Sequence, residues 1–243
     1  MNAPTDPPSH GPAGRAGASN EALIRAQGVF KIYKEGPTET VALQGAAIEL
    51  QAGEFVSLVG PSGSGKTTLM WILAGLSLPS AGQVFVDGVD ITRLDETARA
   101  EIRANQVGLV FQRGNLIPFL SAEENVALAL EMAGHRKGSK AKARDLLGDL
   151  ALGNRSGHYP RQLSGGESQR VAIAVAIANE PAMLFGDEVT GELDSATSDF
   201  VMALLGRLQR ERGLTMMLVT HNPAHAERAD RRLAIVDGVV AAA

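Results

Sequence analysis

Short apolar runs recur along this chain, and each is followed by glycine or by polar residues. Four of them have the length of a strand and show little alternation, which is typical of strands buried on both faces of a parallel sheet. They occupy residues 54–59, 107–111, 183–188 and 214–220. The stretches between them predict helices over residues 66–76, 96–105, 121–133, 139–150 and 171–178. Strands and helices in this order predict an α/β fold with a mainly parallel sheet.

The N-terminal part of the chain has a different pattern. Residues 1–21 are rich in Pro, Gly, Ala and Ser and almost lack large apolar side chains, which predicts a disordered tail. From residue 22 onward, strand-like segments cover 23–33 and 41–50, with breaks at Gly36-Pro37 and at Gly45. These segments predict a small antiparallel β layer ahead of the parallel sheet.

Helical signals dominate the stretch between Gln112 and Leu163. Ser121 and Glu124 have the spacing of a capping box, and Gly138 marks a break before a second helix. A chain of 243 residues is long for one minimal domain. We therefore expect a single domain over residues 22–243 that contains an inserted helical subdomain at about residues 113–165.

Composition excludes several classes of partner. The net charge is −4, so the chain has no basic footprint for nucleic acid, and we expect no nucleic-acid partner. There is no cysteine, which excludes disulfides and thiolate metal sites. The longest apolar stretches, such as 171–178, are much shorter than the ~18 residues that a membrane helix needs, and no export signal is visible.

Residues 60–67 fit the phosphate-loop pattern G-x-x-x-x-G-K-[ST] at every fixed position. Glycines let backbone N–H groups gather around a phosphate, and the following helix points its positive end at the same anion. Lys66 would reach the β- and γ-phosphates, while the Thr67 hydroxyl would ligate Mg²⁺. A glycine-rich turn is the alternative, but the strand before the loop and the helix after it favour a phosphate site. The predicted nucleotide-binding residues are Gly60, Pro61, Ser62, Gly63, Ser64, Gly65, Lys66, Thr67 and Thr68.

Polar residues also follow the other buried strands. Gln112, the pair Asp187-Glu188 and His221 each come at the end of one strand. Because ligands in open α/β sheets bind at the carboxyl ends of the strands, we expect these side chains to surround the loop. Taken singly, a strand-end Gln or His is more often a solvated surface residue. A second possible anion site is the Ser-Gly-Gly at 164–166, because it opens an apolar helix.

The segment 163–170, Leu-Ser-Gly-Gly-Glu-Ser-Gln-Arg, lies between Gln112 and the Asp187-Glu188 pair. In this order the motifs resemble those of ABC transporter ATP-binding subunits, and the resemblance covers about residues 22–240. It implies a P-loop NTPase (RecA-like) core that binds ATP and Mg²⁺ and hydrolyses ATP. It also implies a two-fold dimer with a second copy, a separate integral membrane permease, and a cytoplasmic location at the inner face of the cytoplasmic membrane.

The resemblance also implies a role for each site residue. Tyr33 would stack on adenine. Gln112 would contact Mg²⁺ and the attacking water, and Asp187 would hold Mg²⁺ together with Thr67. Glu188 would polarise the water, and His221 would sense the γ-phosphate. The residues that would act in trans, on the nucleotide of the second copy, are Ser164, Gly165, Gly166 and Asp194.

Within the family, segments 111–118 and 187–196 are similar to those of the lipoprotein-release, macrolide-export and cell-division group. Val189, Glu192 and Val175 depart from that group's usual residues, and none of the three is a phosphate, magnesium or water ligand. Two alternatives stay open. A soluble ABC ATPase of non-transport function would usually carry coiled-coil arms or two cassettes, and a regulatory module without turnover would lack Glu188.

Overall fold

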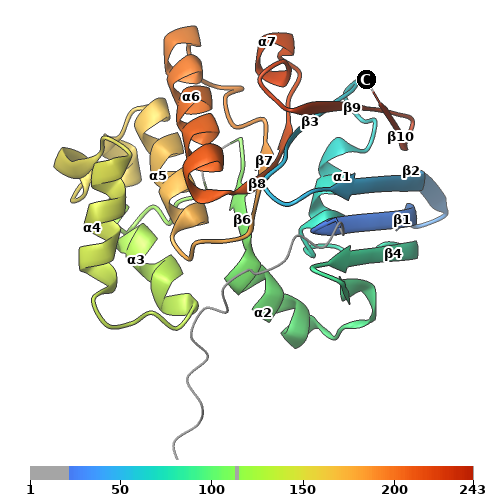
Figure 1. The fold of residues 1–243 in the computed structure, drawn as a ribbon, viewed down its shortest axis with the longest axis horizontal. Helices are drawn as coiled ribbons and strands as arrows, with labels where there is room; N and C mark the ends of the chain where they lie inside the picture. The colour runs from blue at the N-terminus through green and yellow to red at the C-terminus, as the bar shows by residue number, and fades with distance from the viewer. Residues whose placement is uncertain (1–21, 113–114, 243) are drawn as a thin grey trace, which may run out of the picture.

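The computed structural model describes residues 22–112 and 115–242 (Figure 1). The predicted disordered tail, residues 1–21, lies outside these ranges, as do residues 113 and 114 at the start of the predicted helical subdomain. In the described part, two sheets and a group of helices form the fold.

The central sheet has six strands in the order β10-β9-β3-β8-β7-β6. All neighbouring pairs are parallel except β9 and β10, which are antiparallel. The strands are β3 (Phe55–Val59), β6 (Val107–Val110), β7 (Met183–Asp187), β8 (Thr215–Val219), β9 (Arg231–Val236) and β10 (Val239–Ala242). The mainly parallel sheet predicted from the apolar runs is therefore confirmed.

Strand β8 shows why these runs lack alternation. Every residue of β8 is buried. Met216 and Leu218 pack into the core on the helical side, whereas Met217 and Val219 pack into the core on the other side. Since successive side chains point to opposite faces, a strand covered on both faces must be apolar throughout.

The second sheet is antiparallel, in the order β2-β1-β4-β5. Its strands are β1 (Ile24–Glu35), β2 (Thr38–Leu50), β4 (Ala81–Val86) and β5 (Val89–Asp90). The strand break predicted at Gly45 is wrong, because β2 runs through Gly45 without interruption, and register shifts between Ala26 and Ile32 on β1 accommodate the irregular pairing. Bulges of this kind absorb an extra residue and sharpen the twist.

The helices are α1 (Lys66–Leu73), α2 (Glu96–Gln106), α3 (Ala122–Met132), α4 (Ser139–Asp149), α5 (Gly165–Ile177), α6 (Ser195–Arg212) and α7 (Pro223–Ala226). Short 3₁₀ turns lie at Ile91–Arg93, Gly153–Arg155 and Pro160–Gln162. The capping box predicted for α3 is present, with reciprocal bonds between Ser121 and Glu124. Helix α1 is shorter than predicted, because Gly75 with a φ of 70° takes the chain out of the helix.

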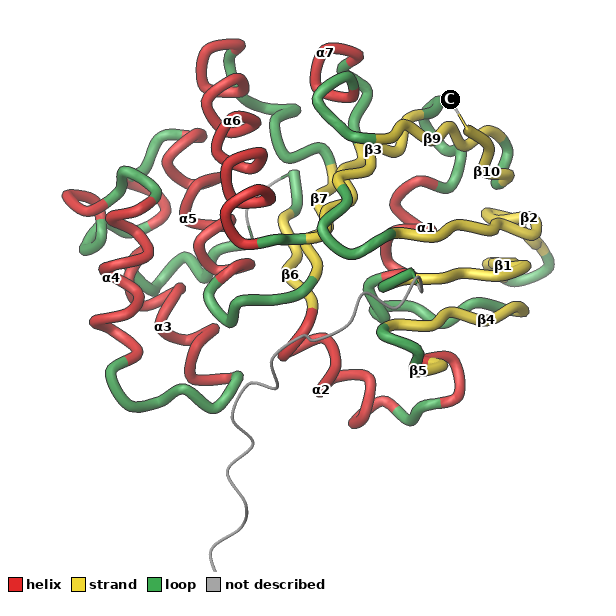
Figure 2. The backbone as a smooth tube through the Cα atoms, in the orientation of Figure 1, coloured by secondary structure: helices red, strands yellow, loops and turns green. Residues whose placement is uncertain are grey.

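The helices divide between the two sides of the central sheet. Helices α3 to α6 gather on one side, whereas the antiparallel sheet lies on the other, next to α1 (Figure 2). Four residues of α1, Leu69, Met70, Ile72 and Leu73, belong to the core shared with the antiparallel sheet. Within the described ranges, no helix is both long and apolar enough to cross a membrane.

Candidate nucleotide-binding site

The phosphate loop connects β3 to α1 and is pressed against two other strands. A Cβ atom at Gly60 would lie 2.2 Å from the carbonyl oxygen of Ile235 on β9. At Gly65, where φ is 102°, a Cβ atom would lie 2.4 Å from the carbonyl oxygen of Ala42 on β2. Any side chain at either position would have to displace backbone, so both sites require glycine.

The loop closes around the side chain of Lys66. Its Nζ donates to the carbonyl oxygens of Gly60, at 2.9 Å, and Pro61, at 2.6 Å. The first hydrogen bond into α1 runs from Leu69 N to Gly65 O, so the backbone N–H groups before Leu69 have no helical acceptor. A cation and a row of free N–H groups therefore meet at one helix N-terminus, which is an anion site.

A hydroxyl and a carboxylate face each other beside the loop. Thr67 Oγ1 donates to Asp187 Oδ2 over 2.9 Å. Burial raises the pKa of Asp187, and so does the charge of Glu188, against the lowering effects of the Thr67 hydrogen bond and the Lys66 charge. Burial is the largest of these effects, so it outweighs the hydrogen bond and the Lys66 charge. Since both donors are oxygens, Thr67 and Asp187 fit Mg²⁺, which binds few protein carboxylates and completes its shell with phosphate oxygens and water.

Glu188 and His221 lie together at the ends of neighbouring strands. Glu188 Oε2 is 3.2 Å from Nδ1 of His221. The backbone N–H of Glu188 donates to Val219 O over 3.0 Å, and its φ of 47° is unusual for a residue other than glycine. A backbone bond to β8 thus holds the glutamate in a strained conformation, with its side chain next to the histidine.

Gln112 reaches the same place from the end of β6. A Cβ atom added to Gly191 would lie 3.3 Å from Glu188 Oε2 and 3.4 Å from Gln112 Nε2, so both side chains lie over this glycine. The predicted convergence of the strand-end residues is therefore present for Gln112, Asp187, Glu188 and His221.

Most of these groups line one cavity of about 390 Å³. The residues that line it are Ala42, Gly60, Ser62, Gly63, Gly65, Lys66, Thr67, Thr68, Asp187, Glu188 and His221. The sequence analysis missed Ala42 and the carbonyl of Ile235, because both reach the loop only through long-range folding and neither carries a chemical signal.

Tyr33 is not part of this cavity wall. It lies on β1, paired with Thr40, and 38% of its surface is exposed. The Lys31 ammonium lies 5.2 Å from the centre of its ring, which is a cation–π distance. An exposed ring supported in this way is available for stacking, and its role toward adenine stays a prediction.

The residues expected to act in trans also lie outside the cavity of their own chain. Ser164 is the N-cap of α5: its Oγ accepts from Glu167 N, and its N–H donates to Glu167 Oε2. Gly166 packs against Thr197 on α6. Asp194 caps α6 by accepting from the backbone N–H and the hydroxyl of Thr197. These bonds cap the N-terminal ends of α5 and α6, and neither end lines the cavity at the chain's own phosphate loop.

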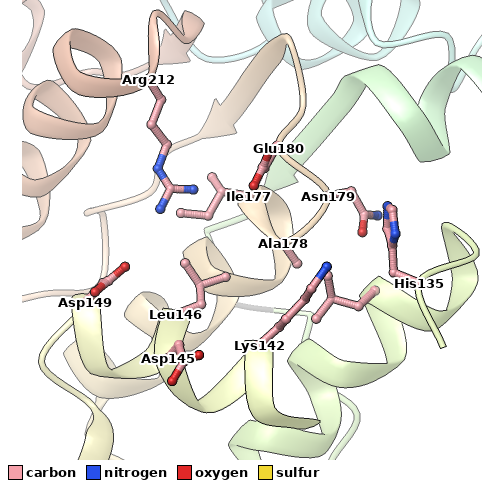
Figure 3. Close-up of a pocket in the computed structure, with 11 residues that line it drawn as sticks. His135, Lys142, Asp145, Leu146, Asp149, Ile177, Ala178, Asn179, Glu180 and Arg212 are labelled. Carbon is pink, nitrogen blue, oxygen red and sulfur yellow. The ribbon is translucent and has the colours of Figure 1, made fainter. Parts of the chain in front are cut away.

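A different cavity, of about 360 Å³, lies at the opposite end of α5 (Figure 3). It is lined by residues of both charges from α3 to α6, among them Lys142, Asp145, Glu180 and Arg212. No residue of the phosphate loop and none of the strand ends at the site reaches it. This second cavity therefore lacks the groups that the loop and the strand ends supply to the first.

A phosphate loop, a hydroxyl–carboxylate pair and a strand-end glutamate on a parallel sheet define a P-loop nucleoside triphosphatase. Comparison with known proteins narrows this class. The family model described as ABC transporter matches residues 43–191. The chain belongs to the ABC transporter family, as one of its ATPases.

Relatives and solved structures agree with this assignment. The chain is 44% identical over 220 residues to the lipoprotein-releasing system ATP-binding protein LolD 2 of Caulobacter vibrioides, covering 90% of this chain and 96% of that protein. It is 45% identical over 221 residues to the macrolide export ATP-binding/permease protein MacB of Syntrophobacter fumaroxidans, but it spans only 31% of that protein's length. A dimeric ATP-binding cassette, MJ0796 bound to ADP and Pi, matches with a TM-score of 0.84 and 38% identity, over 90% of this chain and 96% of that one.

Proposed function

We propose that this protein is the ATP-hydrolysing subunit of an ABC transporter, with hydrolysis in the cavity between the phosphate loop and the ends of β7 and β8. The observation that carries the proposal is the convergence of three groups on one cavity. Lys66 supplies the cation, Thr67 and Asp187 supply hard oxygen donors, and Glu188 with His221 supplies a carboxylate beside an imidazole.

The phosphate loop would bind the triphosphate. The free N–H groups at the start of α1 would donate to the β- and γ-phosphate oxygens. Lys66 would exchange its two carbonyl acceptors in the loop for those oxygens. Because a phosphoryl transfer needs little covalent help, holding the group in place and neutralising its charge supply most of the catalysis.

Thr67 and Asp187 would hold Mg²⁺, and Gln112 would join them from the end of β6. The ion would supply positive charge to the phosphate oxygens. For Asp187, a cation in this place would oppose the effect of burial and bring the pKa of the carboxyl down.

Glu188 would act as the general base. Its carboxylate would accept the proton of the attacking water, and His221 would keep that carboxylate directed into the cavity over the 3.2 Å contact. The Gln112 amide, over the same glycine as Glu188, would position the water from the other side.

The protein would work as a two-fold dimer. Ser164 and Asp194 are not among the residues that line the cavity at their own loop, so they would serve the nucleotide of a second copy. In an isologous dimer, each phosphate loop would then face the partner's residues 163–170, which we call the signature segment, across a bound ATP. A related cassette has been solved as a dimer with ADP and Pi.

The names of the relatives support a membrane partner. One is described as an ATP-binding/permease protein and another as the ATP-binding protein of a lipoprotein-releasing system. We propose that this chain drives a separate integral membrane permease from the cytoplasmic face of the membrane, for export or for lipoprotein release.

Two substitutions test the proposal. Glu188→Gln keeps the size of the side chain but removes the base, so ATP binding should persist while phosphate release falls by about 10²-fold or more. Lys66→Ala should abolish binding and hydrolysis together. Turnover of Glu188→Gln at the parent rate would contradict the assignment of the base. Co-purification with an integral membrane protein in detergent would separate a transporter from a soluble ABC ATPase.

A further inference from the structure

A buried histidine lies behind the catalytic carboxylate, on the short helix α7. His225 is only 6% exposed, and its Nδ1 lies 3.0 Å from Oγ1 of Thr190, which is itself 9% exposed. The mechanism above uses neither residue. The hydrogen bond compensates for the burial of these two polar groups. An imidazole or hydroxyl buried in the same position without a partner would destabilise the fold.

Thr190 belongs to the turn that carries Glu188. Gly191 N donates to Glu188 O over 2.9 Å, and Leu193 N donates to Thr190 O over 3.1 Å. The turn begins with Glu188 in its strained backbone conformation and ends where α6 starts. A shift of the Thr190 side chain would therefore move the backbone that sets the direction of the Glu188 carboxylate.

His225 belongs to the segment that carries His221. Asn222 caps α7 directly after His221: its Oδ1 accepts from Ala224 N, and its own N–H donates to Thr220 Oγ1. One turn later, His225 points back toward β7. The bond between His225 and Thr190 thus joins the two segments whose first residues, His221 and Glu188, meet at 3.2 Å in the cavity.

The surroundings of His225 favour one form of the ring. Asn222 Nδ2, a donor, lies 3.5 Å from Nε2 of His225, so Nε2 is the acceptor and Nδ1–H donates to Thr190. Burial lowers the pKa of His225, and the charges of Arg228 and His221 lower it further against the opposite effect of Asp199. The neutral ring is thus a fixed donor to Thr190.

We propose that His225 is a positioning residue for ATP hydrolysis, which acts through Thr190 to keep the Glu188 carboxylate against His221. The inference rests on the proposed hydrolysis at Glu188. It assigns His225 no contact with the nucleotide. Loss of the bond should therefore lower the rate of hydrolysis and leave ATP binding at the phosphate loop unchanged.

The hydrogen bond between His225 and Thr190 can be removed by changing either residue. His225→Leu replaces the ring by an apolar group, and Thr190→Val replaces the hydroxyl by a methyl. Either change should lower kcat by about 5- to 10-fold, the value of one hydrogen bond, while the ATP dissociation constant stays within about 2-fold. The double variant should be no slower than the slower single variant, because both changes break the same bond.

Two further variants separate positioning from general stability. His225→Asn places an amide donor near the position of Nδ1 and should recover most of the rate. Ser139→Ala removes a hydroxyl of similar burial that bonds Glu131 over 2.7 Å between α3 and α4, outside this turn, so its kcat should stay at the parent value.

An unchanged kcat in folded His225→Leu and Thr190→Val would overturn the inference, and so would additive losses of kcat in the double variant. It would also be overturned if ATP affinity fell in step with kcat, or if His225→Asn did not recover kcat. If His225→Leu fails to fold, Thr190→Val still decides the question. The Glu188→Gln result is independent of all these variants, so a failure here is distinguishable from a failure of the proposed function.

Discussion

Gly166, in the signature segment, packs so closely against Thr197 that this contact sets how much an added side chain should destabilise the fold. A Cβ atom at this position would lie 2.2 Å from Cγ2 of Thr197, and the other atoms of Thr197 would be at least 3.6 Å away. Thr197 cannot rotate freely, because its hydroxyl donates to Asp194 Oδ2 over 2.6 Å. The methyl group would therefore stay in place, and the two elements would have to separate.

Overpacking of this kind costs about 1–3 kcal/mol. Alanine gains back roughly 0.5–1 kcal/mol relative to glycine in a helix. The centres of these two ranges leave a net cost of about 1.25 kcal/mol. For a chain of this size, each kcal/mol corresponds to about 2–4 °C of Tm, so we expect Gly166→Ala to lower Tm by roughly 2.5–5 °C. In a Thr197→Ser background, which lacks Cγ2 but keeps the hydroxyl, the same change should leave Tm unchanged or raise it by about 1–3 °C.

Thermal unfolding of the four proteins of this cycle, without nucleotide, measures the coupling between the two sites. Gly165→Ala is a matched control in the same turn, since its Cβ atom would lie 3.5 Å from Leu193 Cδ2, an ordinary contact. Equal losses of Tm from Gly166→Ala in both backgrounds would refute the argument that the Thr197 methyl group limits this position.

Two further predictions concern the ends of α5. Ser164→Arg should leave the ATP affinity of the monomer near the parent value, because Ser164 is not in the cavity. It should abolish ATP-driven dimerisation, measured by size-exclusion chromatography in a Glu188→Gln background. Dimerisation at the parent ATP dependence would refute the proposed dimer with ATP between its two chains. The hydrogen bond from Arg155 lowers the pKa of Glu167 from 4.5 to about 2, with further lowering from the bonds of Ser164. The ion pair therefore stabilises the fold above about pH 4.5 and loses its effect as the pH falls toward 2. The Tm difference between wild type and Glu167→Gln should shrink between about pH 5 and pH 3, and a difference independent of pH would contradict this.

The chemistry of the site could be predicted from the sequence because each of its residues follows a recognisable local signal. Asp187 and Glu188 end an apolar run, Lys66 and Thr67 complete the phosphate-loop pattern, and parallel strands bring their carboxyl ends to the same edge. The contact between Thr67 and Asp187 over 2.9 Å follows from that topology.

Other parts of the fold have no such local signal. Strand β9 (Arg231–Val236) opens with two arginines and was not predicted, although its Ile235 carbonyl lies against Gly60 of the phosphate loop. Helix α6 was also missed; its apolar residues are spread over a long, largely polar segment. His225 looks in the sequence like one more surface histidine after a proline, and only the folded chain brings Thr190 to it.

The positions of these segments fit the proposed dimer, in which each site is shared between two chains. The phosphate loop, Glu188 and His221 are fixed to the central sheet by β3, β7 and β8, whereas the signature segment is fixed to the helical side by α5. The ion pair between Arg155 and Glu167 and the cap by Ser164 hold the α5 N-terminus in place on that side. In the proposed dimer, the N-terminal end of α1 in one chain and that of α5 in the other would hold one triphosphate between them. ATP binding would then draw two surfaces together, and a membrane partner could use that motion.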